Sequence, residues 1–212
     1  NTDVWSDSYT IYPLSPTSLA AAAFNLKDPT QNITWFNSPT HSTSGVSGNG
    51  TTMYGDTGIN ILNDIGSNNF GMYVRVDSQN ANNQAEMGAI KTSSPFDGGQ
   101  VVPYFSNLDS SFVGGVSNDP LQTSRTGLLG VQKNSSNVDR SLDGVIYGSE
   151  VNALGTAQNI SVFVLARALG TSPNLYTTKT HSFYAITAGG LTSNQIADLH
   201  YAQNKYNTTL AR

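Results

Sequence analysis

From Phe70 onward the chain is a series of short apolar runs separated by turn residues, and this pattern constrains the fold more than any other feature. The runs recur at intervals of roughly ten residues, which is typical of an all-β sandwich or barrel. The first run alternates in polarity as a strand does, so that one face carries Phe70, Met72, Val74 and Val76. The later runs are 86–90, 101–105, 111–116, 126–132, 143–150, 160–167 and 181–187.

Local signals define the geometry of two of these runs. Asp143-Gly144 lies between apolar residues and predicts a tight hairpin, because both central positions of such a turn need positive φ. Pro103 lies inside the run 101–105. It predicts an edge strand or a bulge, because proline donates no hydrogen bond to the ladder.

One helix is predicted at the C-terminal end, with Thr192 as its N-cap. Gln195 completes a capping box with this residue, and Leu191 and Ile196 are placed to pack across the cap. An apolar stripe continues at helical spacing through Ile196, Leu199, Tyr206 and Leu210. We expect this stripe to pack on the β-sheet body.

Composition excludes several classes of protein. With 37% apolar residues, 11% charged residues and a net charge of −4, the chain lacks the high net charge of disordered proteins. It has no cysteine, which excludes disulfides, thiolate metal sites and cysteine nucleophiles. Its ten Lys and Arg residues are scattered, so nucleic-acid binding is not expected. No apolar run is long enough to predict membrane insertion.

The stretch 25–60 is dense in Gly, Asn, Ser and Thr and poor in charge. It also contains the aromatic residues Trp35, Phe36 and Tyr54. We therefore expect ordered loops and short strands there, held by Asx- and ST-turns, and not a linker. The whole chain, 1–212, is predicted to be one domain, with residues 1–10 as a lead-in from an upstream segment.

These segments, in this order, resemble the concanavalin A-like lectin/glucanase superfamily, and more narrowly the laminin-G-like domains of phage tail and other virion proteins. The resemblance is carried by segments 12–16, 24–29, 36–60, 87–92, 126–150 and 161–212. It implies an all-β fold in which two curved antiparallel sheets pack as a jelly-roll sandwich with one C-terminal α-helix. It brings no catalytic residue with it.

Glycan binding is the first functional hypothesis. It needs an exposed aromatic ring to stack on a sugar, with polar side chains beside it to bond the hydroxyls. The segment 168–180 is a loop between two predicted strands and is polar and aromatic, and loops often hold binding residues. The candidate glycan-binding residues are Tyr176, Asn174, Lys179, Trp35 and Tyr54.

A glycoside hydrolase of the same fold is the alternative in a different class. Retaining hydrolysis needs two carboxyls about 5 Å apart, and the glucanases of the superfamily carry them in a Glu-x-Asp-x-Glu triplet or a close variant, which this chain lacks. Its only glutamates, Glu86 and Glu150, would have to form the pair.

Metal binding has little support in the sequence. His41, His181 and His200 show no ligand spacing. Calcium prefers several oxygen ligands close together, and Asp56 and Asp64 lie in Asn- and Asp-bearing loops that would supply them. The expected cofactor is therefore none, or Ca²⁺ at these aspartates.

We predict a non-enzymatic structural or adhesive module of a virion, in a phage tail, a fibre or the capsid surface, with a virion or extracellular location. Its expected partners are copies of itself, other virion proteins and cell-surface glycans. Two alternatives stay open: a pure assembly or decoration protein without a ligand, and a glycoside hydrolase that uses Glu86 and Glu150.

Overall fold

A computed structural model describes most of the 212-residue chain. The described residues are 3–14, 17–66, 69–78, 84–92, 98–105, 108–113, 126–134, 137–151 and 158–210, with the backbone alone at 103–105, 108–113 and 150.

In these residues the strands form two sheets of eight strands each. Sheet A runs in the order β12 (Val145–Val151), β11 (Asn137–Leu142), β10 (Gly127–Asn134), β6 (Phe70–Val76), β16 (Thr180–Thr187), β4 (Gly45–Ser47) and β3 (Thr40–Ser42), with β1 (Ser8–Tyr12) also paired to β16. Sheet B runs in the order β15 (Ser172–Asn174), β14 (Arg167–Leu169), β7 (Met87–Ile90), β13 (Ser161–Val164), β5 (Tyr54–Asn60) and β2 (Thr34–Phe36). Two further strands extend sheet B from β7, namely β8 (Gly98–Phe105) and β9 (Leu108–Val113).

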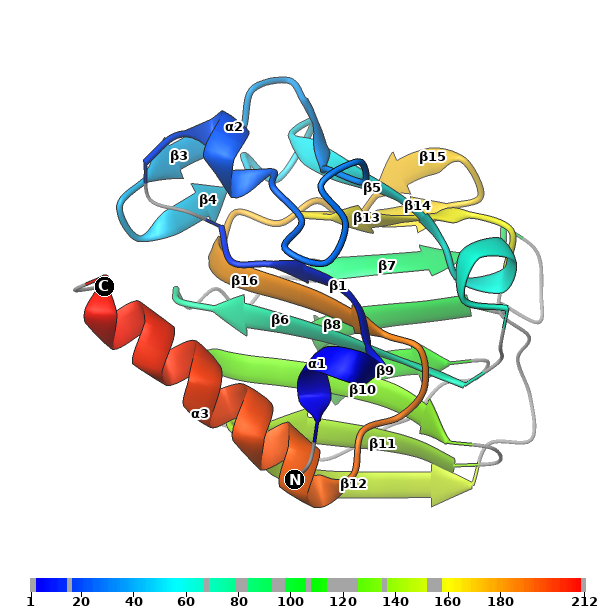
Figure 1. Ribbon diagram of the computed structural model, residues 1–212. Coiled ribbons are helices and arrows are strands. Elements are labelled where there is room, and N and C mark those ends of the chain that lie inside the picture. Colours follow the sequence, from blue (N-terminus) through cyan, green and yellow to red (C-terminus); the bar gives the residue numbers. More distant parts are fainter. Residues whose placement is uncertain are drawn as a thin grey trace.

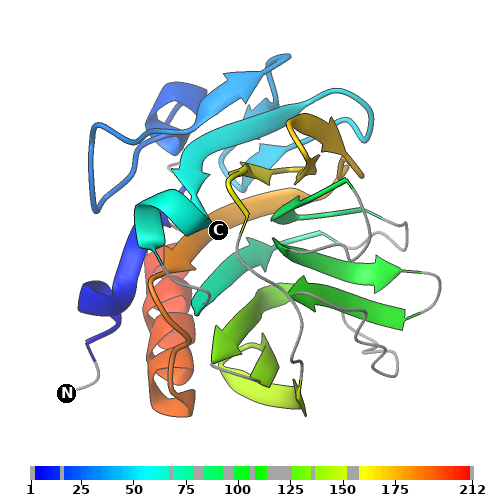
Figure 2. The same cartoon turned by 90° about the vertical axis from the view of Figure 1, so that its right-hand side faces the viewer.

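The two sheets pack against each other, as Figure 1 shows from one side and Figure 2 from another, and the main core lies between them. The face of β6 that was predicted from the alternation supplies Phe70, Met72, Val74 and Val76 to this core, all fully buried. The all-β jelly-roll sandwich predicted from the sequence is therefore confirmed. One detail differs, because β14 pairs with β7 in a parallel manner while the other described strand pairs are antiparallel.

The predicted turn and bulge are both present. Asp143 and Gly144 have φ values of 48° and 87° and join β11 to β12, as a two-residue hairpin turn requires. The register of β8 against β9 shifts between Val102 and Phe105, around Pro103. Because β8 has neighbours on both sides, Pro103 marks a bulge and not an edge strand.

The C-terminal helix α3 (Ser193–Thr209) lies across the outer face of sheet A (Figure 1). Its capping box is present as predicted: the Thr192 hydroxyl accepts from the backbone N–H of Gln195, and the Gln195 side chain accepts from the backbone N–H of Thr192. Leu191 and Ile196 are both buried at the second core, between α3 and sheet A. Of the helices in the described residues, none is long and apolar enough to cross a bilayer.

The buried face of α3 differs in part from the predicted stripe. Ile196 and Leu199 are buried as expected, but the stripe continues through Gln203 and Asn207, while Tyr206 is half-buried. The two amides are placed there because the outer face of sheet A offers them polar partners. Gln203 accepts from Arg75, and Asn207 donates to Ser182.

The polar stretch 25–60 is ordered, as predicted. It contains β2, β3, β4 and the whole of β5. Three short helical segments complete the described structure: α1 (Val4–Asp7), α2 (Leu19–Ala22) and the π-helix η1 (Ile61–Ile65). The predicted lead-in is partly built into sheet A, because β1 pairs with β16.

Candidate functional site

The outer face of sheet B, directed away from sheet A, carries a group of neighbouring polar and aromatic residues. Burial alternates along β5, with Thr57 and Ile59 in the core and Tyr54 and Asp56 half-buried on the other face. Residues opposite each other in a ladder share a face. Because Phe36 pairs with Tyr54 and Phe163 pairs with Asp56, these side chains all belong to the outer face.

Four aromatic rings form a continuous cluster on this face. Phe36 stacks on Tyr54 with ring centroids 4.6 Å apart and planes only 3° from parallel. Tyr54 also contacts Phe163 at 4.9 Å and Tyr176 at 6.2 Å, the latter edge to face. Phe36 is 38% exposed on the edge strand β2 and is the outermost ring, while Phe163 is buried at the base.

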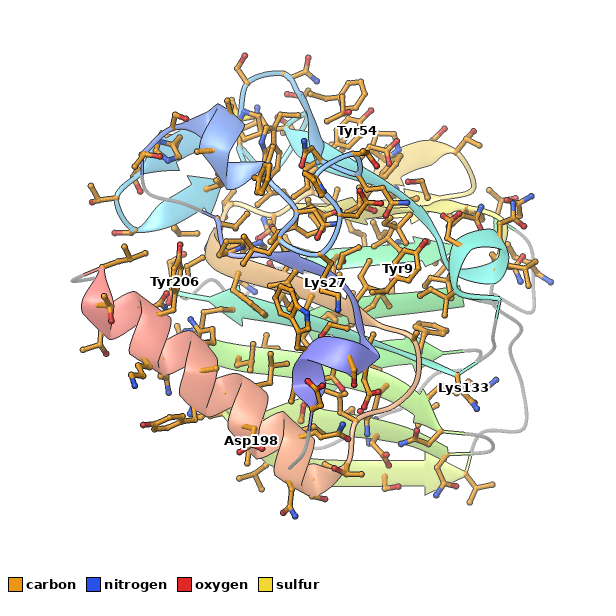
Figure 3. The ribbon with its side chains drawn as sticks, viewed as in Figure 1. Tyr9, Lys27, Tyr54, Lys133, Asp198 and Tyr206 are labelled. Carbon is orange, nitrogen blue, oxygen red and sulfur yellow. The ribbon has the colours of Figure 1, made fainter. Side chains whose placement is uncertain are left out.

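Burial raises the pKa of the Tyr54 phenol, and the nearby Tyr176 and Asp56 raise it further. The phenol therefore keeps its proton at neutral pH and can donate a hydrogen bond. Figure 3 shows that Tyr54 lies far from helix α3, on which Asp198 is labelled.

A guanidinium group continues the cluster along the same face. Arg167 on β14 pairs with Asn174 on β15, and its guanidinium donates to the Asn174 side-chain oxygen at 3.3 Å. The same group donates to Oε1 of Gln100 at 2.6 Å. Gln100 pairs with Gly88, which also pairs with Phe163, so the arginine and the rings share one surface. We call the surface formed by Phe36, Tyr54, Tyr176, Arg167 and Asn174 the aromatic–arginine patch.

The segment that carries Tyr176 is fixed by backbone hydrogen bonds on both sides. The N–H of Ala85 donates to the carbonyl of Leu175 at 2.7 Å, and the N–H of Thr177 donates to the carbonyl of Leu165 at 2.9 Å. The Gln84 side-chain oxygen accepts from the backbone N–H of Thr178 at 3.2 Å. Tyr176 is thus held by a rigid segment even though it lies between strands.

Directly after this segment, Lys179 enters the interior. Its ammonium group is fully buried and lies 2.6 Å from Oε1 of Glu86. The other carboxylate oxygen of Glu86 lies 2.6 Å from Nε2 of His181, whose Nδ1 is 2.5 Å from the Tyr184 hydroxyl. Burial by itself would raise the pKa of Glu86, but Lys179 and then His181 outweigh this effect and lower it.

The sequence-based candidates are therefore only partly brought together. Tyr176, Asn174 and Tyr54 meet in the aromatic–arginine patch, but Lys179 lies in the core, where its charge pairs with Glu86, and not at the surface. Trp35 also lies elsewhere: it packs over Gly55 toward the main core and donates its indole N–H to the carbonyl of Leu19 at 3.0 Å.

Two patch residues, Phe36 and Arg167, were missed as candidates from the sequence. Neighbouring residues in a strand face opposite ways, so Trp35 and Phe36 cannot both face outward. Their register with Tyr54 decides which one does, and the sequence does not show that register. Arg167 begins β14 as a single charge after an apolar run, which gave no signal of its own.

The two glutamates of the hydrolase hypothesis do not form a pair. Glu86 contacts His181 on β16, while the backbone of Glu150 lies on β12, four strands away in sheet A. Four strand spacings correspond to about 19 Å, whereas the carboxyl pairs of glycosidases lie about 5–9.5 Å apart. The side chain of Glu150 lies outside the described residues.

The two calcium candidates accept hydrogen bonds from groups of the protein itself. Asp56 accepts from the backbone N–H of Gly58 at 2.8 Å and from the Ser161 hydroxyl. Asp64 accepts from the backbone N–H of Asn60 at 2.6 Å. Within the described ranges, no three His, Asp or Glu side chains are grouped closely enough to hold a metal ion.

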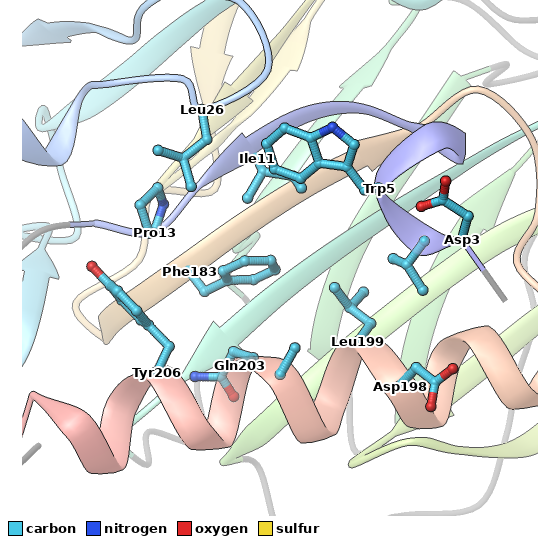
Figure 4. Close-up of a pocket in the computed structure, with 12 residues that line it drawn as sticks. Asp3, Trp5, Ile11, Pro13, Leu26, Phe183, Asp198, Leu199, Gln203 and Tyr206 are labelled. Atoms are coloured by element: carbon cyan, nitrogen blue, oxygen red, sulfur yellow. The ribbon is translucent and has the colours of Figure 1, made fainter. Parts of the chain in front are cut away.

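A second surface feature lies on the opposite side of the sandwich. It is an apolar pocket of about 420 Å³ between α3, the N-terminal residues and the outer face of sheet A (Figure 4). Its walls include Trp5, Leu26, Phe183, Leu199 and Tyr206. Trp5 and Leu26 are 52% and 46% exposed, so this pocket opens to the surface.

Comparison with known proteins supports the fold and leaves the family open. No protein-family model matches the sequence, and no curated protein is detectably similar to it. Among solved structures, the chain is similar to domain 4 of an extracellular arabinanase from Geobacillus stearothermophilus in complex with arabinotriose. The TM-score is 0.56 at 15% identity, over 92% of this chain and 98% of that domain.

Two larger proteins contain a similar unit. A Trypanosoma rangeli sialidase in complex with sialic acid matches with a TM-score of 0.67 at 10% identity, over 95% of this chain. The binding domain of botulinum neurotoxin DC in complex with SialylT matches with a TM-score of 0.58 at 10% identity, over 94% of this chain. The chain spans 34% of the sialidase and 52% of the toxin domain. At these identities the likeness shows the shared β-sandwich, in agreement with the concanavalin A-like expectation at the level of fold.

Proposed function

We propose that this domain binds glycans through the aromatic–arginine patch, as a non-enzymatic adhesive module. The observation that carries the proposal is the cluster of Phe36, Tyr54 and Tyr176 on one face, with the side chains of Arg167 and Asn174 beside it. Aromatic faces stack on the apolar faces of sugars, while neighbouring amide and guanidinium groups bond hydroxyls. The patch combines both on a rigid sheet.

The similar structures support glycan binding as the class of function. The arabinanase domain, which the chain matches over nearly its full length, is described with arabinotriose bound. The toxin binding domain and the sialidase are described with SialylT and sialic acid. A role without catalysis is supported by the separation of Glu86 from Glu150. The location on a virion rests on the resemblance of the sequence to laminin-G-like domains of phage proteins, and we propose it on that basis.

The apolar pocket beside α3 favours the alternative of an assembly protein without a glycan ligand. Exposed apolar surface rimmed by polar residues is typical of protein contacts. Trp5, Leu26 and Tyr206 give the pocket this character.

A glycan-array screen of the purified domain tests the proposal, with calcium and with chelator in parallel. We expect a specific signal that Tyr54→Ala weakens about tenfold, as loss of a central aromatic contact does. Tyr201→Ala is the matched control, because Tyr201 is a 68% exposed tyrosine on α3, outside the patch.

Absence of any signal, or a signal that survives both Tyr54→Ala and Phe36→Ala, would count against glycan binding by the patch. In the first case a molecular mass that rises with protein concentration would support the assembly alternative. Loss of the signal on chelation alone would direct attention from the rings to an ion-dependent site.

A further inference from the structure

The guanidinium of Arg167 lies among neutral partners. Its two described hydrogen bonds go to amide oxygens, those of Gln100 at 2.6 Å and Asn174 at 3.3 Å. Within the described part of the chain, its Nε has no hydrogen-bond partner, and neither does Nε2 of the fully buried Gln100. The base of the patch thus holds two buried N–H donors without an acceptor among the described residues.

The described cations that form ion pairs contrast with Arg167. Lys179 is paired with Glu86, and Arg75 lies 3.0 Å from Asp77. Among the described residues no carboxylate lies within ion-pair distance of Arg167. Burial lowers the pKa of its guanidinium. Since arginine stays protonated in proteins, this half-buried positive charge is not compensated by any carboxylate of the described residues.

An uncompensated charge at this depth is costly unless a ligand pairs with it. A guanidinium fork fits a planar carboxylate better than it fits a hydroxyl, because two parallel charge-assisted hydrogen bonds can form. We infer that the aromatic–arginine patch takes a carboxylate-bearing sugar, with the carboxylate on Arg167 and the sugar ring against Tyr176 and Tyr54. This inference rests on the proposed function and specifies its ligand class.

The charges around the patch also set the orientation and limit the number of acidic groups. Asp56 lies on the same face beside Tyr54, at the end away from Arg167. A second negative charge on the ligand would be repelled there. The net charge of −4 gives no general attraction for polyanions. The patch therefore suits one carboxylate at the β14–β15 end and a neutral portion toward β5.

Calorimetric titration with matched ligand pairs tests this. The pairs are sialyllactose against lactose, and methyl glucuronide against methyl glucoside, so that each acidic probe carries one carboxylate. The expected result is that at least one acidic probe binds about tenfold to a hundredfold tighter than its neutral counterpart, which is the effect of a hydrogen bond to a charged group. Arg167→Gln should reduce acidic binding to the neutral level, whereas Tyr54→Ala should weaken both members of a pair alike.

Two controls keep the result interpretable. Arg75→Gln removes the same charge from the outer face of sheet A and should preserve the preference for the acidic probe. Arg167→Lys keeps the positive charge but not the guanidinium fork, and it should retain only part of the preference for the acidic probe. This variant replaces Arg167→Gln in the test if Arg167→Gln does not fold.

Equal binding of both members of each pair overturns the inference alone and leaves glycan binding intact. An undiminished preference for the acidic probe in Arg167→Gln, or in Arg167→Lys where only that variant folds, also overturns it. Absence of binding by every probe and every glycan overturns the inference together with the proposed function.

Discussion

The buried ion pair beneath the segment of Tyr176 gives the sharpest prediction about stability. Glu86→Ala removes a carboxylate with two contacts of 2.6 Å and leaves the fully buried ammonium of Lys179 without its partner. Loss of one member of a buried pair costs about 3–5 kcal/mol. For a chain of this size that corresponds to a fall in Tm of about 6–20 °C.

Thermal unfolding followed by circular dichroism measures this fall. Asp64→Asn is the matched control, because it removes a carboxylate at an exposed position and should change stability by no more than about 0.5 kcal/mol. The double variant Glu86→Gln/Lys179→Met should lie closer to the wild type than Glu86→Ala, since it leaves no unpaired charge. A Tm for Glu86→Ala within about 2 °C of the wild type would refute the reasoning.

The same ion pair predicts a pH dependence. In the folded state the pKa of the Glu86 carboxyl is lowered. The ionised carboxylate therefore stabilises the fold fully at pH values above the pKa that Glu86 has in the unfolded chain. This contribution is lost as the pH falls through the folded-state pKa. The difference in unfolding free energy between the wild type and Glu86→Gln should therefore shrink on acidification. A difference that grows at acid pH would contradict this assignment.

Two further variants probe the local geometry. Thr192→Ala removes the N-cap acceptor of the Gln195 N–H and should cost about 1 kcal/mol in unfolding free energy, measured by urea titration. No loss would mean that the capping box contributes nothing. Gly45→Ala should cost more than Gly66→Ala, because both positions have positive φ but the new Cβ at position 45 would lie 2.1 Å from the carbonyl oxygen of His181. Equal costs would show that strain and not this clash dominates.

Local signals in the sequence were sufficient for the elements that depend on near neighbours. The alternation of 70–76, the turn at Asp143-Gly144 and the capping box at Thr192 each involve residues within a few positions, and each is present. The α3 stripe was only partly correct beyond Leu199. The polar partners of Gln203 and Asn207 lie on strands more than twenty residues away, and no helical periodicity reports them.

The candidate site depended on long-range pairing and was less predictable. Lysine is rarely buried, so Lys179 was expected at the surface. Its burial depends on Glu86, 93 positions earlier in the chain. The choice between Trp35 and Phe36 depended in the same way on the register of β2 against β5. The aromatic–arginine patch joins side chains from four strands and one loop, and the sequence alone does not order those strands.

The buried ion pair and the aromatic–arginine patch share one short segment, which contributes Lys179 to the ion pair and Tyr176 to the patch. Tyr176 lies on the outer face, while Thr177, Lys179 and His181 are buried. An apolar pair of similar volume would often be as stable as a buried ion pair, so stability alone does not explain Glu86 and Lys179. A directional contact fixes how far the segment enters the core, and with it the position of the Tyr176 ring against Tyr54. We therefore expect the Glu86→Gln/Lys179→Met variant to keep its Tm more fully than its affinity for glycans.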